Sequence, residues 1–250
     1  MRISIALISL ISLLAPLVSL AQSDLNGVFL RGSGSQGYPM SQWSAEELPF
    51  TKAGQLQFDN NVPGKGPRQT MPALGNDPLG DANPPGLYRT LVYGRPWEFI
   101  QFDNRVVQVF EWGKHWRTIW TDDREVPDVI IAGPYWYGYS VGEWENDTLV
   151  VKTVGLDGRA WMDEWGNQVS DFALIEEHWR RVGDTLEMTI TVNDPDLYRE
   201  PWTSDTKIFN PQSPDTLNGE LMEQIFAPID EMEFNRRIRD PAAAGPTGQN

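Results

Sequence analysis

A repeated hairpin pattern between residues 97 and 209 most constrains the fold of this chain. Three short polar turns each separate two runs of alternating apolar and polar residues; the turns are Phe102-Asp103-Asn104-Arg105, Glu145-Asn146-Asp147-Thr148 and Val182-Gly183-Asp184-Thr185. Short turns of this composition join antiparallel strands. A large antiparallel sheet buries its apolar face by closing into a barrel or folding into a sandwich. The pattern therefore predicts an all-β antiparallel meander that closes into a β-barrel, with a β-sandwich as the alternative.

The same alternation locates the individual strands. In the segment 185–193, Leu186, Met188, Ile190 and Val192 share one face of an extended chain, and polar residues dominate the other. One face is therefore expected to belong to the core and the other to contact water. The expected strands are 97–102, 106–112, 115–121, 137–145, 148–154, 173–182, 185–193, 203–209 and 220–226.

The first 21 residues have the pattern of a secretory signal peptide. Arg2 precedes an apolar run from Ile3 to Leu20, and the small residue Ala21 provides a cleavage point before Gln22. An uncleaved membrane anchor is the alternative, but Pro16 interrupts the apolar run. We expect cleavage, no membrane insertion of the mature chain, and a periplasmic or secreted location.

Three further regions follow the signal peptide. Residues 22–96 are rich in glycine and proline and predict an arm that wraps the barrel or covers a cavity, with one strand near its start. Within this arm, Thr51 is a candidate N-cap for a short helix over residues 51–58. The barrel is expected over 97–230, and the tail at 231–250 is predicted to be partly disordered.

Composition restricts the partners and the chemistry. The chain carries 35 acidic and 20 basic residues, a formal charge of −15, which repels phosphate backbones, so we predict no nucleic-acid partner. It contains no cysteine and two histidines, which excludes thiolate catalysis and a three-histidine metal site. No motif for a metal or a cofactor is apparent, and we predict neither. The sequence does not predict the oligomeric state.

The first candidate site is the long connection between residues 157 and 171. Carboxylates alternate there with tryptophans, and a tryptophan beside a carboxyl group can desolvate it and raise its pKa toward that of a general acid. Alternatively, the tryptophans close the barrel end and the acids are solvated. The candidates here are Asp163 and Asp171 as catalytic residues, and Trp161, Trp165 and Ser170 as ligand-binding residues.

The second candidate site is formed by charged and aromatic residues on the expected strands. In Ile175-Glu176-Glu177-His178-Trp179-Arg180-Arg181 each face carries an acid and a base, and an inward Glu177 could pair with Arg181, two steps further along the same face of the strand. A purely structural ion pair is the alternative. The candidates are Glu177 and Tyr139 for catalysis, and Tyr137, His178, Arg181 and Arg117 for ligand binding.

Several ordered blocks support a resemblance to a known group of proteins. They are Trp136-Tyr137-Gly138-Tyr139-Ser140-Val141-Gly142-Glu143-Trp144-Glu145-Asn146-Asp147-Thr148-Leu149-Val150-Val151, Trp161-Met162-Asp163, Asp194-Pro195 and Pro201-Trp202-Thr203. With these blocks, the chain resembles a widespread family of exported bacterial proteins that have a lipocalin-like barrel pattern and no agreed biochemical activity. In that family Pro-His usually stands where this chain has Gln168-Val169. The resemblance implies that the chain has lost a histidine that could act as a base in its relatives.

Three functions are compatible with these patterns. The first is an exported barrel that binds a small hydrophobic or amphipathic molecule in its cavity. The second is a cofactor-independent lyase, isomerase or hydrolase that uses carboxylate acid/base catalysis on such a molecule. The third is a carbohydrate-binding protein, which predicts exposed rather than buried tryptophan and tyrosine side chains. The fold alone does not distinguish them.

Overall fold

The computed structural model describes residues 23–32, 42–44, 46–71, 74–81, 83–128, 133–216, 219–223 and 235–240. The predicted signal peptide at 1–21 and most of the predicted tail lie outside these residues. Within the described ranges, no helix is long and apolar enough to cross a membrane.

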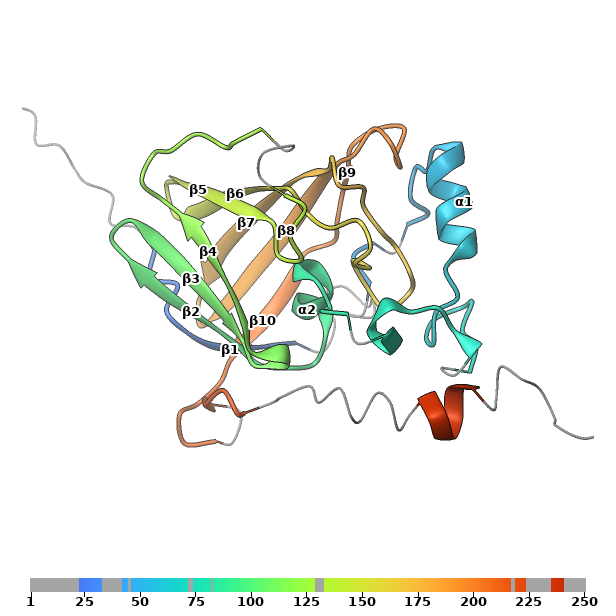
Figure 1. Cartoon of the computed structure of the whole chain (residues 1–250). Coiled ribbons are helices and arrows are strands. Elements are labelled where there is room, and N and C mark those ends of the chain that lie inside the picture. Colours follow the sequence, from blue (N-terminus) through green and yellow to red (C-terminus); the bar gives the residue numbers. More distant parts are fainter. Residues whose placement is uncertain are drawn as a thin grey trace, which may run out of the picture.

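Nine strands close into a β-barrel, and a tenth short strand pairs on its outside (Figure 1). The strands are β1 Gly27–Arg31, β2 Trp97–Phe102, β3 Arg105–Phe110, β4 His115–Trp120, β5 Tyr139–Glu145, β6 Thr148–Val154, β7 Leu174–Val182, β8 Thr185–Asn193, β9 Trp202–Thr203 and β10 Lys207–Pro211. Closure comes from β10, which pairs with β1 on one side and with β8 on the other. The all-β barrel is confirmed, and the sandwich alternative is wrong.

The three predicted turns join β2 to β3, β5 to β6 and β7 to β8. Asn146 and Gly183, in the second and third turns, have φ values of 60° and 59°. These values lie in the left-handed region, which asparagine and glycine tolerate better than other residues. The turn chemistry therefore fixes the register of these hairpins, and the predicted strands 97–102, 148–154 and 185–193 match the observed bounds.

The sheet differs from a purely antiparallel meander at one junction. Strands β4 and β5 are parallel and share two residue pairs, Ile119 with Ser140 and Trp120 with Val141. A short hairpin cannot join parallel strands, because the chain must first return to the end from which it started. The connection over residues 121–138 is long enough for that return. Its length was visible in the sequence, but the direction of the next strand was not.

The predicted strand 203–209 is two strands with a bulge between them. Thr203 pairs with Thr191, and Lys207 pairs with Met188. The chain therefore advances four residues from Thr203 to Lys207 while β8 advances three residues from Met188 to Thr191. One extra residue in this position is a β-bulge. The Ser204 hydroxyl accepts the Ile190 amide at 3.0 Å within the bulge. The predicted strand 220–226 is also wrong as far as it is described, because residues 220–223 form no strand.

Two α-helices come from the glycine- and proline-rich arm. Helix α1, Lys52–Asn60, begins after Thr51, whose hydroxyl accepts the Gly54 amide at 3.0 Å, so the predicted cap is confirmed. Helix α2, Leu87–Val92, has all of its residues buried and lies at one end of the barrel (Figure 1). The other short helices among the described residues are η2 Pro78–Asp81, η3 Trp112–Lys114 and η5 Asn235–Arg239.

The barrel interior holds an aromatic core. The Trp97 ring contacts the rings of Phe99, Trp179 and Phe209 edge-on, with centroids 4.9 to 5.5 Å apart. The predicted inward face of β8 is confirmed, because Leu186 and its three alternating partners are buried. Burial of such side chains contributes about 1.5–3 kcal/mol each, which explains how a chain without disulfides is stabilised.

Candidate functional site

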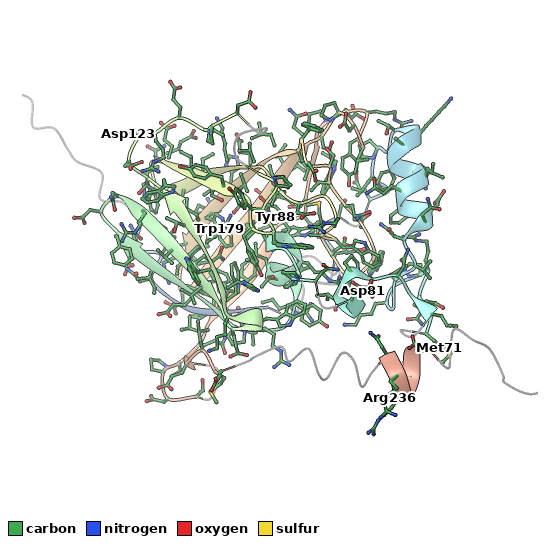
Figure 2. The ribbon with its side chains drawn as sticks, in the orientation of Figure 1. Met71, Asp81, Tyr88, Asp123, Trp179 and Arg236 are labelled. Atoms are coloured by element: carbon green, nitrogen blue, oxygen red, sulfur yellow. The ribbon has the colours of Figure 1, made fainter. Side chains whose placement is uncertain are left out.

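Glu177 on β7 is fully buried. Its Oε1 accepts hydrogen bonds from Arg117 Nη1 at 2.7 Å and from the Tyr88 hydroxyl at 2.9 Å, and its Oε2 accepts Arg117 Nη2 at 2.6 Å and Trp179 Nε1 at 2.8 Å. The Thr153 hydroxyl adds a further bond to Oε1 at 3.1 Å. Tyr88 comes from α2, and Trp179 comes from β7; Figure 2 shows both inside the molecule. The carboxylate is therefore enclosed by donors from the helix and from the sheet.

This bonding explains the charge state of Glu177. Burial raises the pKa of a carboxyl group, but the Arg117 guanidinium and the other donors lower it more, so the pKa of Glu177 lies below its ordinary value. The predicted pairing of Glu177 with Arg181 is wrong. Arg181 instead donates from Nε to the carbonyl oxygen of Asp24 at 2.6 Å and from Nη2 to that of Asn26 at 3.0 Å. Arg181 thereby ties β7 to the segment before β1.

The space beside α2 is almost filled. Gly86, Tyr88, Trp136 and Trp161 enclose a cavity of about 10 Å³, which is room for about one water molecule. Trp161 is buried, and Arg89 lies over its ring at 5.5 Å. At this end of the barrel, the predicted ligand-binding residue Trp161 therefore contributes to packing.

The connection between β6 and β7 is folded around the Asp163 carboxylate. Its Oδ1 accepts the Trp165 amide at 2.9 Å and the Asn167 amide at 3.2 Å, and its Oδ2 accepts Asn167 Nδ2 at 2.7 Å. Burial raises the pKa of the Asp163 carboxyl, although these donors lower it. Gly166, with φ at 88°, provides the left-handed residue of this turn. Asp163 is fully buried, and its contacts hold the loop in shape.

Asp171 and Ser170 fix the base of the same loop. Asp171 Oδ1 accepts the Gly158 amide at 2.6 Å, across the loop. The Ser170 amide and hydroxyl both donate to the Asp194 carboxylate, at 2.7 and 2.8 Å. The loop is thus joined to itself and to the turn that follows β8.

An open groove of about 490 Å³ lies along this loop. Its polar lining residues are Gln57, Asp157, Arg159, Gln168, Ser170 and Asp171. Helix α1 forms one wall, because Gln57 Nε2 donates to Gln168 Oε1 at 2.9 Å. Asn61, in the C-cap position of α1, donates to the same oxygen at 2.7 Å. The helix and the loop therefore hold the groove in one shape.

A charged pair lies in the groove. Arg159 Nη2 donates to Asp157 Oδ2 at 2.6 Å, and Arg159 Nε donates to Asp157 Oδ1 at 2.9 Å. The Arg159 guanidinium lowers the pKa of the Asp157 carboxyl below its ordinary value. The Arg159 side chain is 70% exposed, and its Nη1 makes no hydrogen bond within the described residues. The groove consequently offers carboxylate acceptors and one guanidinium donor to a ligand.

Aromatic side chains adjoin these polar groups. The Arg159 guanidinium lies over the Trp136 ring at 4.9 Å. Tyr135 and Phe172, neighbours of the lining residues Pro134 and Asp171, are 59% and 56% exposed. The Tyr135 carbonyl accepts the Asp157 amide at 3.0 Å, so the Tyr135 backbone lies beside that of Asp157. Flat apolar surface and hydrogen-bonding groups therefore occur together at this end of the barrel.

The other predicted residues lie away from the groove. Tyr137 is buried against the His115 and Phe110 rings, and burial raises its pKa to about 12. The Tyr139 hydroxyl accepts Arg124 Nη1 at 3.0 Å in the connection after β4. Trp165 packs against Gly66 of the arm.

His178 occupies a different surface. It faces outward on β7, where its Nε2 lies 2.9 Å from Glu176 Oε1, in a shallow hollow with Thr148 and Arg180. Of the predicted site residues, the structure brings only Ser170 and Asp171 together in the groove. The roles assigned to the others remain predictions.

Four polar groove residues were missing from the predicted set: Gln57, Asp157, Arg159 and Gln168. Asp157 and Arg159 belong to the Asp-Gly-Arg sequence at the start of the loop, which could have indicated an ion pair. Gln57 could not have been found, because nothing in the sequence places α1 beside the loop. Among the described residues, no group of three histidine, aspartate or glutamate side chains could hold a metal ion.

The fold and the groove define a closed β-barrel with a polar, aromatic-flanked groove at one end. No protein-family model, curated protein or solved structure matches this chain.

Proposed function

We propose that this chain is an exported barrel protein of the family it resembles, and that it binds a small amphipathic molecule in the groove beside the 157–171 loop. The observation that carries the proposal is the Arg159–Asp157 pair, whose exposed guanidinium lies over the Trp136 ring, with the exposed residues Tyr135 and Phe172 next to lining residues in the sequence. A ligand that fits has hydroxyl groups for the charged pair and a flat apolar face for the rings. Sugars attached to an apolar chain have both properties.

The groove supports this proposal better than the barrel interior does. Side chains that already contact one another occupy the interior positions described above, from the Trp97 cluster to the Glu177 network. Small-molecule sites are concave and combine apolar surface with a few polar groups that fix orientation. The groove has this combination. The amphipathic ligand predicted for the barrel cavity is therefore reassigned to the groove.

The enzyme alternative depends on Asp171. Asp163 and Glu177 are fully buried, and their carboxylate oxygens are occupied by internal donors. Proton transfer needs a group within reach of the substrate, and of the three predicted catalytic carboxylates only Asp171 lines the groove. Catalysis would therefore pair Asp171 with Asp157. Incubation of alkyl glycosides with the wild type and with Asp171→Asn tests for turnover, and a product absent with the variant would support it.

Isothermal titration calorimetry with alkyl glycosides tests the binding proposal. Octyl glucoside, octyl galactoside and octyl maltoside, kept below their micelle concentrations, supply the amphipathic ligand, and glucose and octanol supply its two halves. We expect at least one glycoside to bind, and Arg159→Ala and Tyr135→Ala each to weaken it about tenfold or more. Arg180→Ala, on the outer face of β7, is the matched control and should bind as the wild type does. Binding of no glycoside, or equal binding by all variants, would contradict the proposal.

A further inference from the structure

Most of the outward-facing residues of β2, β3 and β4 are apolar. Outward-facing residues alternate with the buried ones along these strands. Trp116 is 67% exposed and Phe102 is 46% exposed. We call this surface the outer apolar face; it consists of Ile100, Phe102, Val107, Val109, Trp116 and Trp120.

The strand register makes this face continuous. Val109 pairs with Trp116, and Ile100 pairs with Val107. Arg105 lies between Phe102 and Trp120, its pairing partners on the two neighbouring strands. Residues opposite one another on neighbouring strands have Cβ atoms about 4.5–5.5 Å apart, so their side chains touch. Within the described residues, the Trp116 indole makes no hydrogen bond and no ring contact. An exposed, contiguous apolar patch with a polar rim indicates an interaction surface.

Two opposite charges lie diagonally across the outer apolar face. Glu98, opposite Val109, is at one end, and Arg105, opposite Trp120, is at the other. The Arg105 guanidinium lies over the Phe102 ring at 4.8 Å. Glu98 has no hydrogen bond or ion pair in the described part of the chain. A two-fold axis in the plane of the face, between Ile100 and Val107, would place Glu98 of each copy opposite Arg105 of the other.

We propose that the outer apolar face binds a second copy of this chain in a symmetric dimer. In such an interface the same patch meets itself, and the Glu98–Arg105 contact forms twice at the edge of an apolar centre. Two β-sheets that pack face to face cross at about 30°. The diagonal position of the two charges also requires the strands of the two copies to cross at an angle. The formal charge of −15 opposes the alternative occupant, an anionic membrane surface.

Charge reversal tests the dimer. Glu98→Arg and Arg105→Glu each place like charges opposite one another, and each should weaken dimerisation about tenfold or more in sedimentation analysis. The double variant exchanges the two charges and should regain the wild-type dissociation constant to within about threefold. Trp116→Ser should also weaken the dimer, and Arg180→Glu, on another outer face, should not.

Cross-linking gives a second, independent test. The chain has no cysteine, so a single introduced thiol can link only to another copy. Packed sheets lie about 10 Å apart, too far for a disulfide, so a short bis-maleimide is the appropriate reagent. Val107→Cys should cross-link to a dimer, and Thr189→Cys on β8 should remain monomeric.

Three results would overturn the proposal. The first is a wild-type chain that stays monomeric up to about 100 µM, a concentration at which weak interfaces still associate. The second is a dimer that the charge reversals leave unchanged, and the third is equal cross-linking of both cysteine variants. Sedimentation with vesicles of phosphatidylcholine, with and without anionic phosphatidylglycerol, covers the remaining alternative, a membrane surface. Vesicle binding that Trp116→Ser abolishes, by a chain that is monomeric in solution, would assign the face to a lipid surface instead.

Discussion

Arg117 on β4 and Glu177 on β7 form a bidentate ion pair across the barrel, with Nη1 to Oε1 at 2.7 Å and Nη2 to Oε2 at 2.6 Å. The two residues are 60 positions apart in the sequence, and both are buried. Tyr88 of α2 donates to the same carboxylate, so the pair also holds the helix in the barrel. Such a pair adds little net stability compared with apolar residues, but loss of one partner leaves an unpaired buried charge.

We predict that single and double replacements of this pair behave differently. Arg117→Met should lower the free energy of unfolding by about 3–5 kcal/mol, because it leaves the Glu177 carboxylate buried without its cation. The double variant Arg117→Met, Glu177→Leu should lose much less, since no charge remains. Urea denaturation followed by tryptophan fluorescence measures both values. A double variant as unstable as the single one would contradict this account.

The low pKa of Glu177 predicts a stability that depends on pH. The folded state holds the Glu177 pKa below the ordinary value of 4.5, so the unfolded chain binds this proton more readily. The stabilisation is therefore present above about pH 4.5 and is lost as the pH falls through the lower, folded pKa. Denaturation midpoints between about pH 3 and pH 7 check the sign. In the double variant Arg117→Met, Glu177→Leu, this part of the acid dependence should disappear.

Asp163 and Asp171 should respond differently to the same substitution. In Asp163→Asn, an amide nitrogen replaces one carboxylate oxygen and cannot accept the hydrogen bonds that Trp165 and Asn167 donate to it. We therefore expect the free energy of unfolding to fall by about 1–3 kcal/mol. Asp171→Asn keeps an oxygen for the Gly158 amide on an exposed side chain and should change stability by less than about 0.5 kcal/mol. Thermal unfolding compares the two. Equal effects would argue against Asp163 as the residue that organises the loop.

Gly54 allows α1 to pack closely against the backbone at Leu197. A Cβ atom at this position would lie 2.0 Å from the Leu197 carbonyl oxygen, which already accepts the Thr51 amide at 2.9 Å. Gly54→Ala should therefore destabilise the protein by about 1–3 kcal/mol, although alanine favours helices. Leu56→Ala, at a position 63% exposed on the same helix, is the control and should be near neutral. A stabilising Gly54→Ala would show that α1 is not docked in this position.

The sequence contained enough information for most of the barrel. Alternation and turn composition are local properties, so the hairpins around Asn146 and Gly183 could be predicted from neighbouring residues. The parallel β4–β5 pair and the bulge at Ser204 depend on which distant strand each segment meets. Local patterns do not carry that information.

The candidate site was harder to predict for the same reason. Glu177 was identified as an inward acid, but its partner Arg117 was assigned separately, because the contact joins two strands distant in the sequence. The loop containing Asp171 was identified from its length and composition. The wall that α1 provides through Gln57 depends on tertiary packing.

The most direct test of the proposed site is an NMR titration of the uniformly ¹⁵N-labelled chain with the alkyl glycosides. We predict saturable shifts of the Gly158 and Asp171 amides and of the Trp136 indole, because these groups lie in or beside the groove. The indole signals of Trp116, on the outer apolar face, and of Trp179, in the barrel core, should not move. Shifts centred on Trp179 would place the ligand inside the barrel and contradict the account, and so would a groove that no glycoside perturbs.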